Sequence, residues 1–85
     1  MKHLYSVFWT HDVTKDSYKC ANETFRSLNE ARAKLDEMRT IHRKDRQDNA
    51  VILTNLGKAI DERGDTTLAK ELKKVMRDDF KKRVS

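Results

Sequence analysis

The sequence predicts an α+β domain of order ββαββα, in which a four-stranded antiparallel sheet carries two helices packed on one face. Three patterns in the 85 residues lead to this expectation. Aromatic and β-branched residues cluster near the start, apolar residues recur at helical spacing in two long segments, and a glycine-containing turn divides the stretch between those segments. At this length, residues 1–85 are expected to form a single domain.

The first two strands are expected to form a hairpin. Residues 3–10, HLYSVFWT, are rich in the aromatic and β-branched types that favour strands. The polar stretch HDVTKDS follows, and a second strand is expected near residues 18–25.

The first helix is expected to begin at Ser27, because Ser27 and Glu30 have the spacing of a capping box. Its buried stripe recurs at helical spacing and consists of Leu28, Ala31, Leu35, Met38 and His42. Glu30 and Lys34 are expected to pair on the solvent side, four residues apart. The polar run at residues 43–49 should end the helix.

The stretch AVILTNLGKAIDERGD, residues 50–65, can be read as a helix or as a hairpin. As a helix it would give a β-hairpin followed by three helices, and its spacing resembles that of a tetratricopeptide repeat at Leu56, Gly57, Ile60, Gly64 and Ala69. That spacing occurs once, whereas such repeats need neighbours to bury their faces. Gly57 inside a helix would also cost about 1 kcal/mol.

The hairpin is favoured for this stretch because residues 54–58 supply a turn with glycine where positive φ is needed. In this interpretation Ile52 falls opposite Ile60 as a cross-strand apolar pair. Gly64, Asp65 and Thr66 then provide a break and a helix cap.

The last helix is expected to run from this cap to about residue 81. Its apolar stripe consists of Leu68, Leu72, Val75, Met76 and Phe80. Asp79 falls on the same side, which suggests that the helix frays or turns near that residue.

The basic character of the chain is concentrated in this last segment. The 19 Lys and Arg and 14 Asp and Glu give a net charge of +5, but residues 1–65 contribute only +1 and residues 66–85 contribute +4. On a helix, five of these side chains fall within a sector of about 100° opposite the apolar stripe. These candidate binding residues are Lys70, Lys73, Lys74, Arg77 and Lys81. With Lys82 and Arg83, such a row could neutralise several phosphates, or it could be a solvated helix surface.

The first strand supplies a second candidate surface because it is apolar on both sides. Tyr5, Val7 and Trp9 point one way, whereas Leu4 and Phe8 point the other. If the helices cover one face only, Tyr5 and Trp9 are expected to face outward and to stack on bases or pack on a protein. The alternative is that this strand is central and that a loop or tail covers its second face.

Other chemistry is not expected from this sequence. The three histidines and Cys20 lack the short paired spacings of a metal site, and two glycines cannot build a phosphate-cradling loop. We therefore expect no enzyme, no metal and no cofactor. The single cysteine, and the lack of an apolar run near the roughly 20 residues that span a bilayer, favour a cytoplasmic protein without a membrane partner.

These observations predict a small basic binding protein that contacts nucleic acid through its cationic C-terminal helix. The alternative is a protein-interaction module that recognises an acidic protein surface. It would act as a regulator or inhibitor of a host protein, of the accessory type that phages and mobile elements encode. Only 36% of the residues are hydrophobic, and such a small apolar content also suggests self-association, for example as a homodimer.

Overall fold

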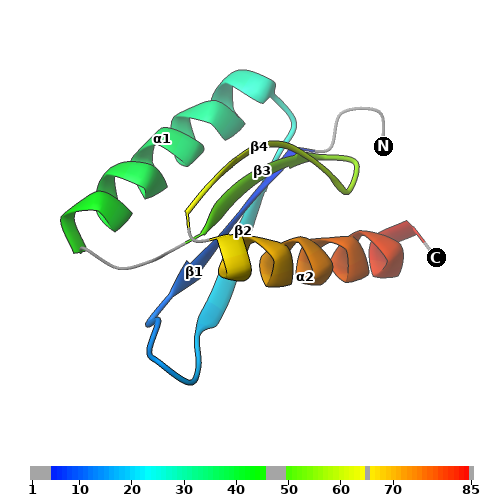
Figure 1. Ribbon diagram of the computed structural model, residues 1–85. Helices are drawn as coiled ribbons and strands as arrows, with labels where there is room; N and C mark the ends of the chain where they lie inside the picture. Colours follow the sequence, from blue (N-terminus) through cyan, green and yellow to red (C-terminus); the bar gives the residue numbers. More distant parts are fainter. Residues whose placement is uncertain (1–4, 46–49, 65, 85) are drawn as a thin grey trace.

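The computed structural model describes residues 5–45, 50–64 and 66–84, which form two helices and four strands in the order ββαββα (Figure 1). The first half of the chain forms β1 (Tyr5–His11), β2 (Lys19–Phe25) and α1 (Leu28–Asp45). The second half forms β3 (Val51–Asn55), β4 (Lys58–Arg63) and α2 (Thr66–Val84). All neighbouring strands are antiparallel and the sheet order is β2-β1-β3-β4. The predicted α+β class, element order and antiparallel sheet are therefore confirmed.

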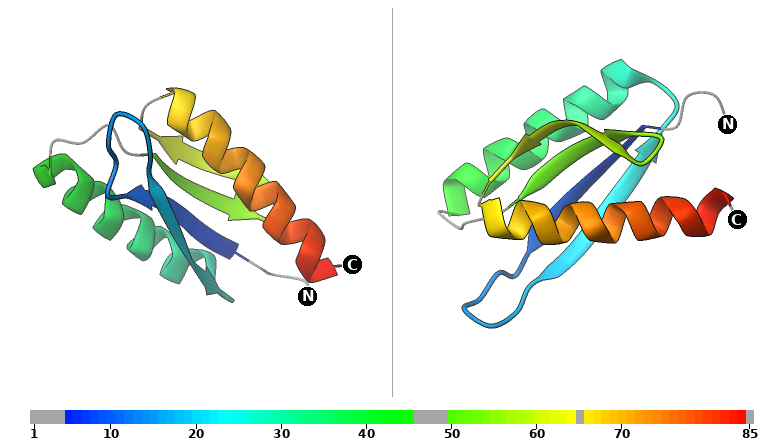
Figure 2. Two further views of the ribbon diagram at one scale, coloured as in Figure 1. Left: turned by 90° about the horizontal axis from the view of Figure 1, so that it is seen from below. Right: turned by 45° about the vertical axis from the view of Figure 1, so that its right-hand side comes forward.

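The two helices lie on opposite faces of the sheet, so the prediction that both pack on one face is wrong. Leu35 of α1 lies in one buried cluster with Val7 and Leu53, whereas Leu72 of α2 lies in another with Ile52. The left view of Figure 2 shows the strands between the two helices. Consecutive strand residues point to opposite faces, and the central strands β1 and β3 are apolar at consecutive positions. Each face therefore needs its own helix.

The β3–β4 hairpin confirms the interpretation of residues 50–63 as two strands. Leu56 and Gly57 form the turn with φ of 52° and 82°, the pair of positive values that a type I′ turn requires. The expected pairing of Ile52 with Ile60 is wrong, since Ile52 lies opposite Glu62. The register shifts by one residue after Leu53, so that Ile60 is the additional residue of a bulge on the edge strand.

The first helix begins as predicted. The Glu30 N–H donates to the Ser27 hydroxyl at 3.5 Å, and the Ala31 N–H donates to the Ser27 carbonyl at 3.1 Å. Ala31, Leu35 and Met38 are buried, while the predicted stripe position 42 lies outside the described side chains. Within the described part of the chain, no helix has the length and apolar character needed to cross a membrane.

Candidate cationic surface

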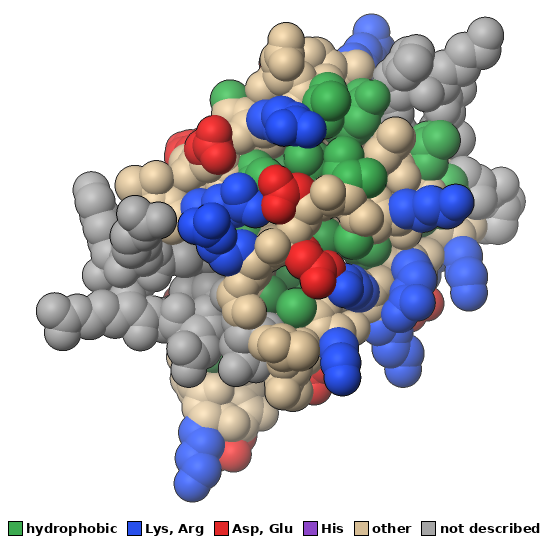
Figure 3. All heavy atoms as spheres, turned by 45° about the horizontal axis from the view of Figure 1, so that its top comes forward, with side chains coloured by type: hydrophobic (Ala, Val, Ile, Leu, Met, Phe, Trp, Pro, Cys, Tyr) green, Lys and Arg blue, Asp and Glu red, His purple; other side chains and the backbone are tan. Residues whose placement is uncertain are grey.

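The outward side of α2 carries the five predicted basic residues because the opposite side is fixed against the sheet. Leu72 and Met76 are buried with Phe8 and Ile52, while Leu68 packs against that cluster. We call the outward row the cationic face of α2; it consists of Lys70, Lys73, Lys74, Arg77 and Lys81. All of these side chains are exposed except Lys73, which is half-buried. Lys and Arg side chains gather on the side of the molecule where α2 lies (Figure 3).

Four of these residues form one straight row. Lys70, Lys74, Arg77 and Lys81 follow each other at intervals of four, three and four residues. With a rise of 1.5 Å per residue, the row is about 16 Å long. Because the helix is buried on its other side, the spacing along the row is fixed by the fold.

The basic side chains of this face differ in whether they already form ion pairs or hydrogen bonds within the protein. Lys73 forms an ion pair with Glu62 of β4, and the Arg77 Nε–H donates to the Lys73 carbonyl at 3.3 Å. Within the described residues, Lys70, Lys74 and Lys81 form no ion pair. Most of the positive charge on this face is therefore available to a partner.

The carboxylates of α2 lie beside this face or on the apolar side of the helix. Burial raises the pKa of Tyr18 above its ordinary value, and the nearby carboxylate of Glu71 raises it further. Asp79 lies on the apolar side and forms an ion pair with Arg83 Nε at 2.9 Å. Glu71 and Asp78, seven residues apart, are both exposed and lie on the same side of the row.

The end of α2 differs from the sequence-based expectation in two respects. The helix continues to Val84, so it does not fray at Asp79, because Arg83 supplies that carboxylate with a partner. Arg83 was expected to join the phosphate-binding row. Instead its Nη1–H donates to Thr24 Oγ1 at 2.9 Å and its Nη2–H to Asn22 Oδ1 at 3.4 Å, both on β2. Arg83 therefore links the end of α2 to β2 through hydrogen bonds.

Tyr5 and Trp9 do not form an open aromatic face. Both are half-buried and pack against the cluster beneath α1, with Lys34 Nζ 5.2 Å from the centroid of the Trp9 ring. They lie on the face of the sheet opposite to α2, so the structure separates them from the five basic residues. The alternative is correct in that β1 is central and covered on both sides, but a helix and not a loop or tail covers the second face.

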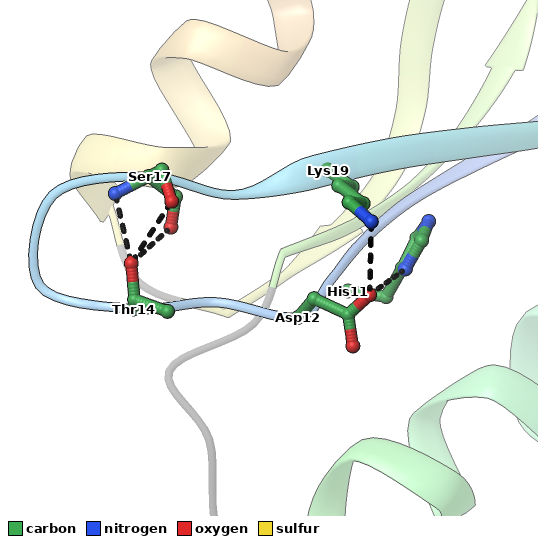
Figure 4. Close-up of polar contacts among 5 residues, drawn as sticks. All are labelled: His11, Asp12, Thr14, Ser17 and Lys19. Atoms are coloured by element: carbon green, nitrogen blue, oxygen red, sulfur yellow. Dashed lines mark hydrogen bonds and ion pairs between the residues drawn. The ribbon is translucent and has the colours of Figure 1, made fainter.

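The β1–β2 loop lies beside the start of α2 and has a defined conformation (Figure 4). Thr14 N–H donates to the Ser17 carbonyl at 2.7 Å, and Ser17 N–H donates to Thr14 Oγ1 at 3.0 Å. Asp12 takes φ of 50°, and its carboxylate contacts Lys19 and His11. A hollow of about 540 Å³ separates residues 13–18 from the first turns of α2. Among the described residues, no group of His, Cys, Asp and Glu is arranged to hold a metal ion.

Two exposed apolar side chains on the β3–β4 hairpin were missed by the sequence analysis. Leu56 is 41% exposed in the turn, beside Phe80 of α2, and Ile60 is 47% exposed on the edge strand. The exposure of Ile60 is not evident from the sequence, because the predicted register places Ile60 in a cross-strand apolar pair with Ile52. Hydrophobic side chains are visible between the two helices in Figure 3.

Comparison with protein-family models, curated proteins and solved structures finds no match to this chain.

Proposed function

We propose that this chain is a small non-enzymatic binding protein that holds nucleic acid through the cationic face of α2. The observation that carries the proposal is the row of Lys70, Lys74 and Lys81, exposed on a helix whose other side is fixed to the sheet and without ion pairs to described residues. Arg77 completes the row and Lys73 lies beside it. A fixed row of this kind binds a polyanion without first breaking internal ion pairs.

The expected mechanism is electrostatic. Each phosphate neutralised by Lys or Arg releases counterions, so affinity falls steeply as salt rises. With four such contacts, the slope of log K against log salt concentration should be about −3.6 for duplex DNA. Contacts of this type position the partner but carry little sequence information.

The test is a salt titration of binding to a mixed-sequence duplex, with the double charge reversal Lys74→Glu and Arg77→Glu. We expect binding at low salt to be lost in this variant. The matched control reverses Arg26 and Arg32, two exposed arginines outside α2, and should retain binding. Absence of binding by the unaltered protein at low salt would rule out the proposal.

A protein partner with an acidic surface is the second candidate, and the exposed apolar residues Leu56 and Ile60 favour it. These side chains lie on the hairpin that α2 contacts through Phe80 and Lys73. Such a complex should persist at higher salt, since its apolar contacts are not screened.

Ile60→Ser and Leu56→Ser should weaken this protein complex while leaving nucleic-acid binding unchanged. A second copy of the chain could use the same residues, which sedimentation across micromolar concentrations would detect.

A further inference from the structure

We infer that the nucleic acid bound by the cationic face of α2 is a duplex, held by its phosphate backbone without reading of sequence. This inference rests on the proposed function and specifies the class of ligand. It follows from where the fold places the aromatic side chains, and from the composition and rigidity of α2.

Of the six aromatic side chains, Phe8 is buried and the other five are half-buried, so none is exposed. Tyr5, Trp9 and Phe25 pack beneath α1, and Phe8 is buried beneath α2. Phe80 lies over the β3–β4 turn, and Tyr18 lines the hollow beside the first turns of α2. Proteins that hold single strands combine a cationic groove with aromatic side chains on which bases stack, at about 1–3 kcal/mol per base. The cationic face of α2 has the charge but carries no exposed aromatic side chain on which a base could stack.

The geometry of the row suits a stiff partner with a dense charge array. The Cα atoms of successive residues in the row are about 4.5 or 6 Å apart along a straight helix axis. Duplex DNA carries about one charge per 1.7 Å of its axis and is rigid over roughly 150 base pairs. A duplex therefore offers many phosphates in fixed positions, whereas a flexible single strand must be ordered along the row without compensating base contacts.

The composition of α2 favours backbone contacts over base reading. The helix contains no Asn or Gln, the residues that pair with adenine in the major groove. Arg77, the residue of the row best suited to guanine, already donates its Nε–H to the Lys73 carbonyl. The lysines of the row are point charges on flexible stems, which neutralise phosphates of any sequence.

The test compares a duplex with each of its separated strands at equal length, by fluorescence anisotropy over a range of salt concentrations. Four neutralised phosphates release about 0.9 counterions each from a duplex and about 0.7 each from a single strand, so the duplex should bind roughly sixfold more tightly at about 0.1 M salt. Shuffling the duplex sequence should leave the affinity unchanged. Lys74→Gln should reduce the duplex slope by about 0.9, and Arg32→Gln on α1 should not alter it.

The outcomes separate this inference from the proposed function. If a single strand binds as tightly as the duplex or more tightly, the inference is overturned while the proposed function stands. A strong dependence on duplex sequence, or tighter binding of a sulfated polysaccharide of matched length, would also overturn it. If neither nucleic acid binds at low salt, the proposed function itself fails.

Discussion

The ring of Phe80 in α2 lies directly over Gly57 in the β3–β4 turn, so that a Cβ atom at position 57 would approach its Cγ and Cδ2 atoms to 2.8 Å. Gly57 also has φ of 82°, which L side chains rarely adopt. We expect Gly57→Ala to lower the free energy of unfolding by roughly 2–4 kcal/mol, since backbone strain and overpacking both contribute. Urea unfolding followed by circular dichroism measures this change.

Phe80→Ala provides the background that separates the two contributions. Without the ring, Gly57→Ala should cost only the backbone component of roughly 1–2 kcal/mol. Leu56→Ala, at the exposed neighbouring position of the same turn, should change the free energy of unfolding by no more than about 0.5 kcal/mol. An equal cost of Gly57→Ala in both backgrounds would show that the Phe80 contact does not constrain the turn.

The element order could be predicted because each boundary has a local cause. Ser27 caps a helix, Gly57 permits a tight turn, and Leu72 and Met76 recur at helical spacing. The placement of the helices could not be obtained from spacing alone, because it depends on which strands become central. The relevant signal was present in Val51, Ile52 and Leu53, since three consecutive buried residues in a strand require cover on both faces.

The candidate site was predictable to a similar extent. Helical periodicity placed the basic residues opposite Leu72 and Met76, because the buried side of a helix determines its exposed side. The partners of these charges come from other elements and leave no local pattern: Glu62 of β4 holds Lys73, and β2 holds Arg83. The partners of Lys34 could not be predicted for the same reason: Lys34 forms ion pairs with Glu23 and Glu37, whereas the predicted partner was Glu30.

Lys34 connects α1 to β2 and to the single tryptophan. Its Nζ lies 3.3 Å from carboxylate oxygens of both Glu23 and Glu37, and over the Trp9 ring. Desolvation by itself would lower the pKa of Lys34, but hydrogen bonds with Glu37 and Glu23 outweigh it and raise the pKa. Lys34→Met should therefore lower the free energy of unfolding by roughly 1 kcal/mol and change Trp9 fluorescence. Arg32→Met, on the exposed side of the same helix, should change neither; unchanged fluorescence in Lys34→Met would contradict the contact.

Tyr18 should make the protein lose stability in alkali. Burial and the contact with Glu71 raise its pKa above 10.0 in the folded state. A raised folded pKa contributes stability that is fully present below the unfolded value and is lost as pH rises through the folded value. Stability should therefore decline above about pH 10, and less steeply in Tyr18→Phe.

Glu71→Gln tests the cause of this shift. Removing the carboxylate should bring the pKa of Tyr18 closer to its ordinary value, while the part due to burial remains. Tyrosinate absorbance, taken as the difference from Tyr18→Phe, follows this residue separately from Tyr5. An unchanged Tyr18 titration in Glu71→Gln would show that the contact is not formed.

Arg83 should contribute to stability and not to nucleic-acid binding, because its guanidinium is held by Asp79, Thr24 and Asn22. Arg83→Gln should lower the free energy of unfolding by roughly 1–2 kcal/mol and speed amide exchange in the last turn of α2. The slope of log K against log salt should stay the same, whereas Lys81→Gln, two residues earlier and on the cationic face, should reduce the slope without a loss of stability. If Arg83→Gln reduces the slope as much as Lys81→Gln does, Arg83 must leave β2 to meet a phosphate. The cationic surface would then extend to the end of the helix.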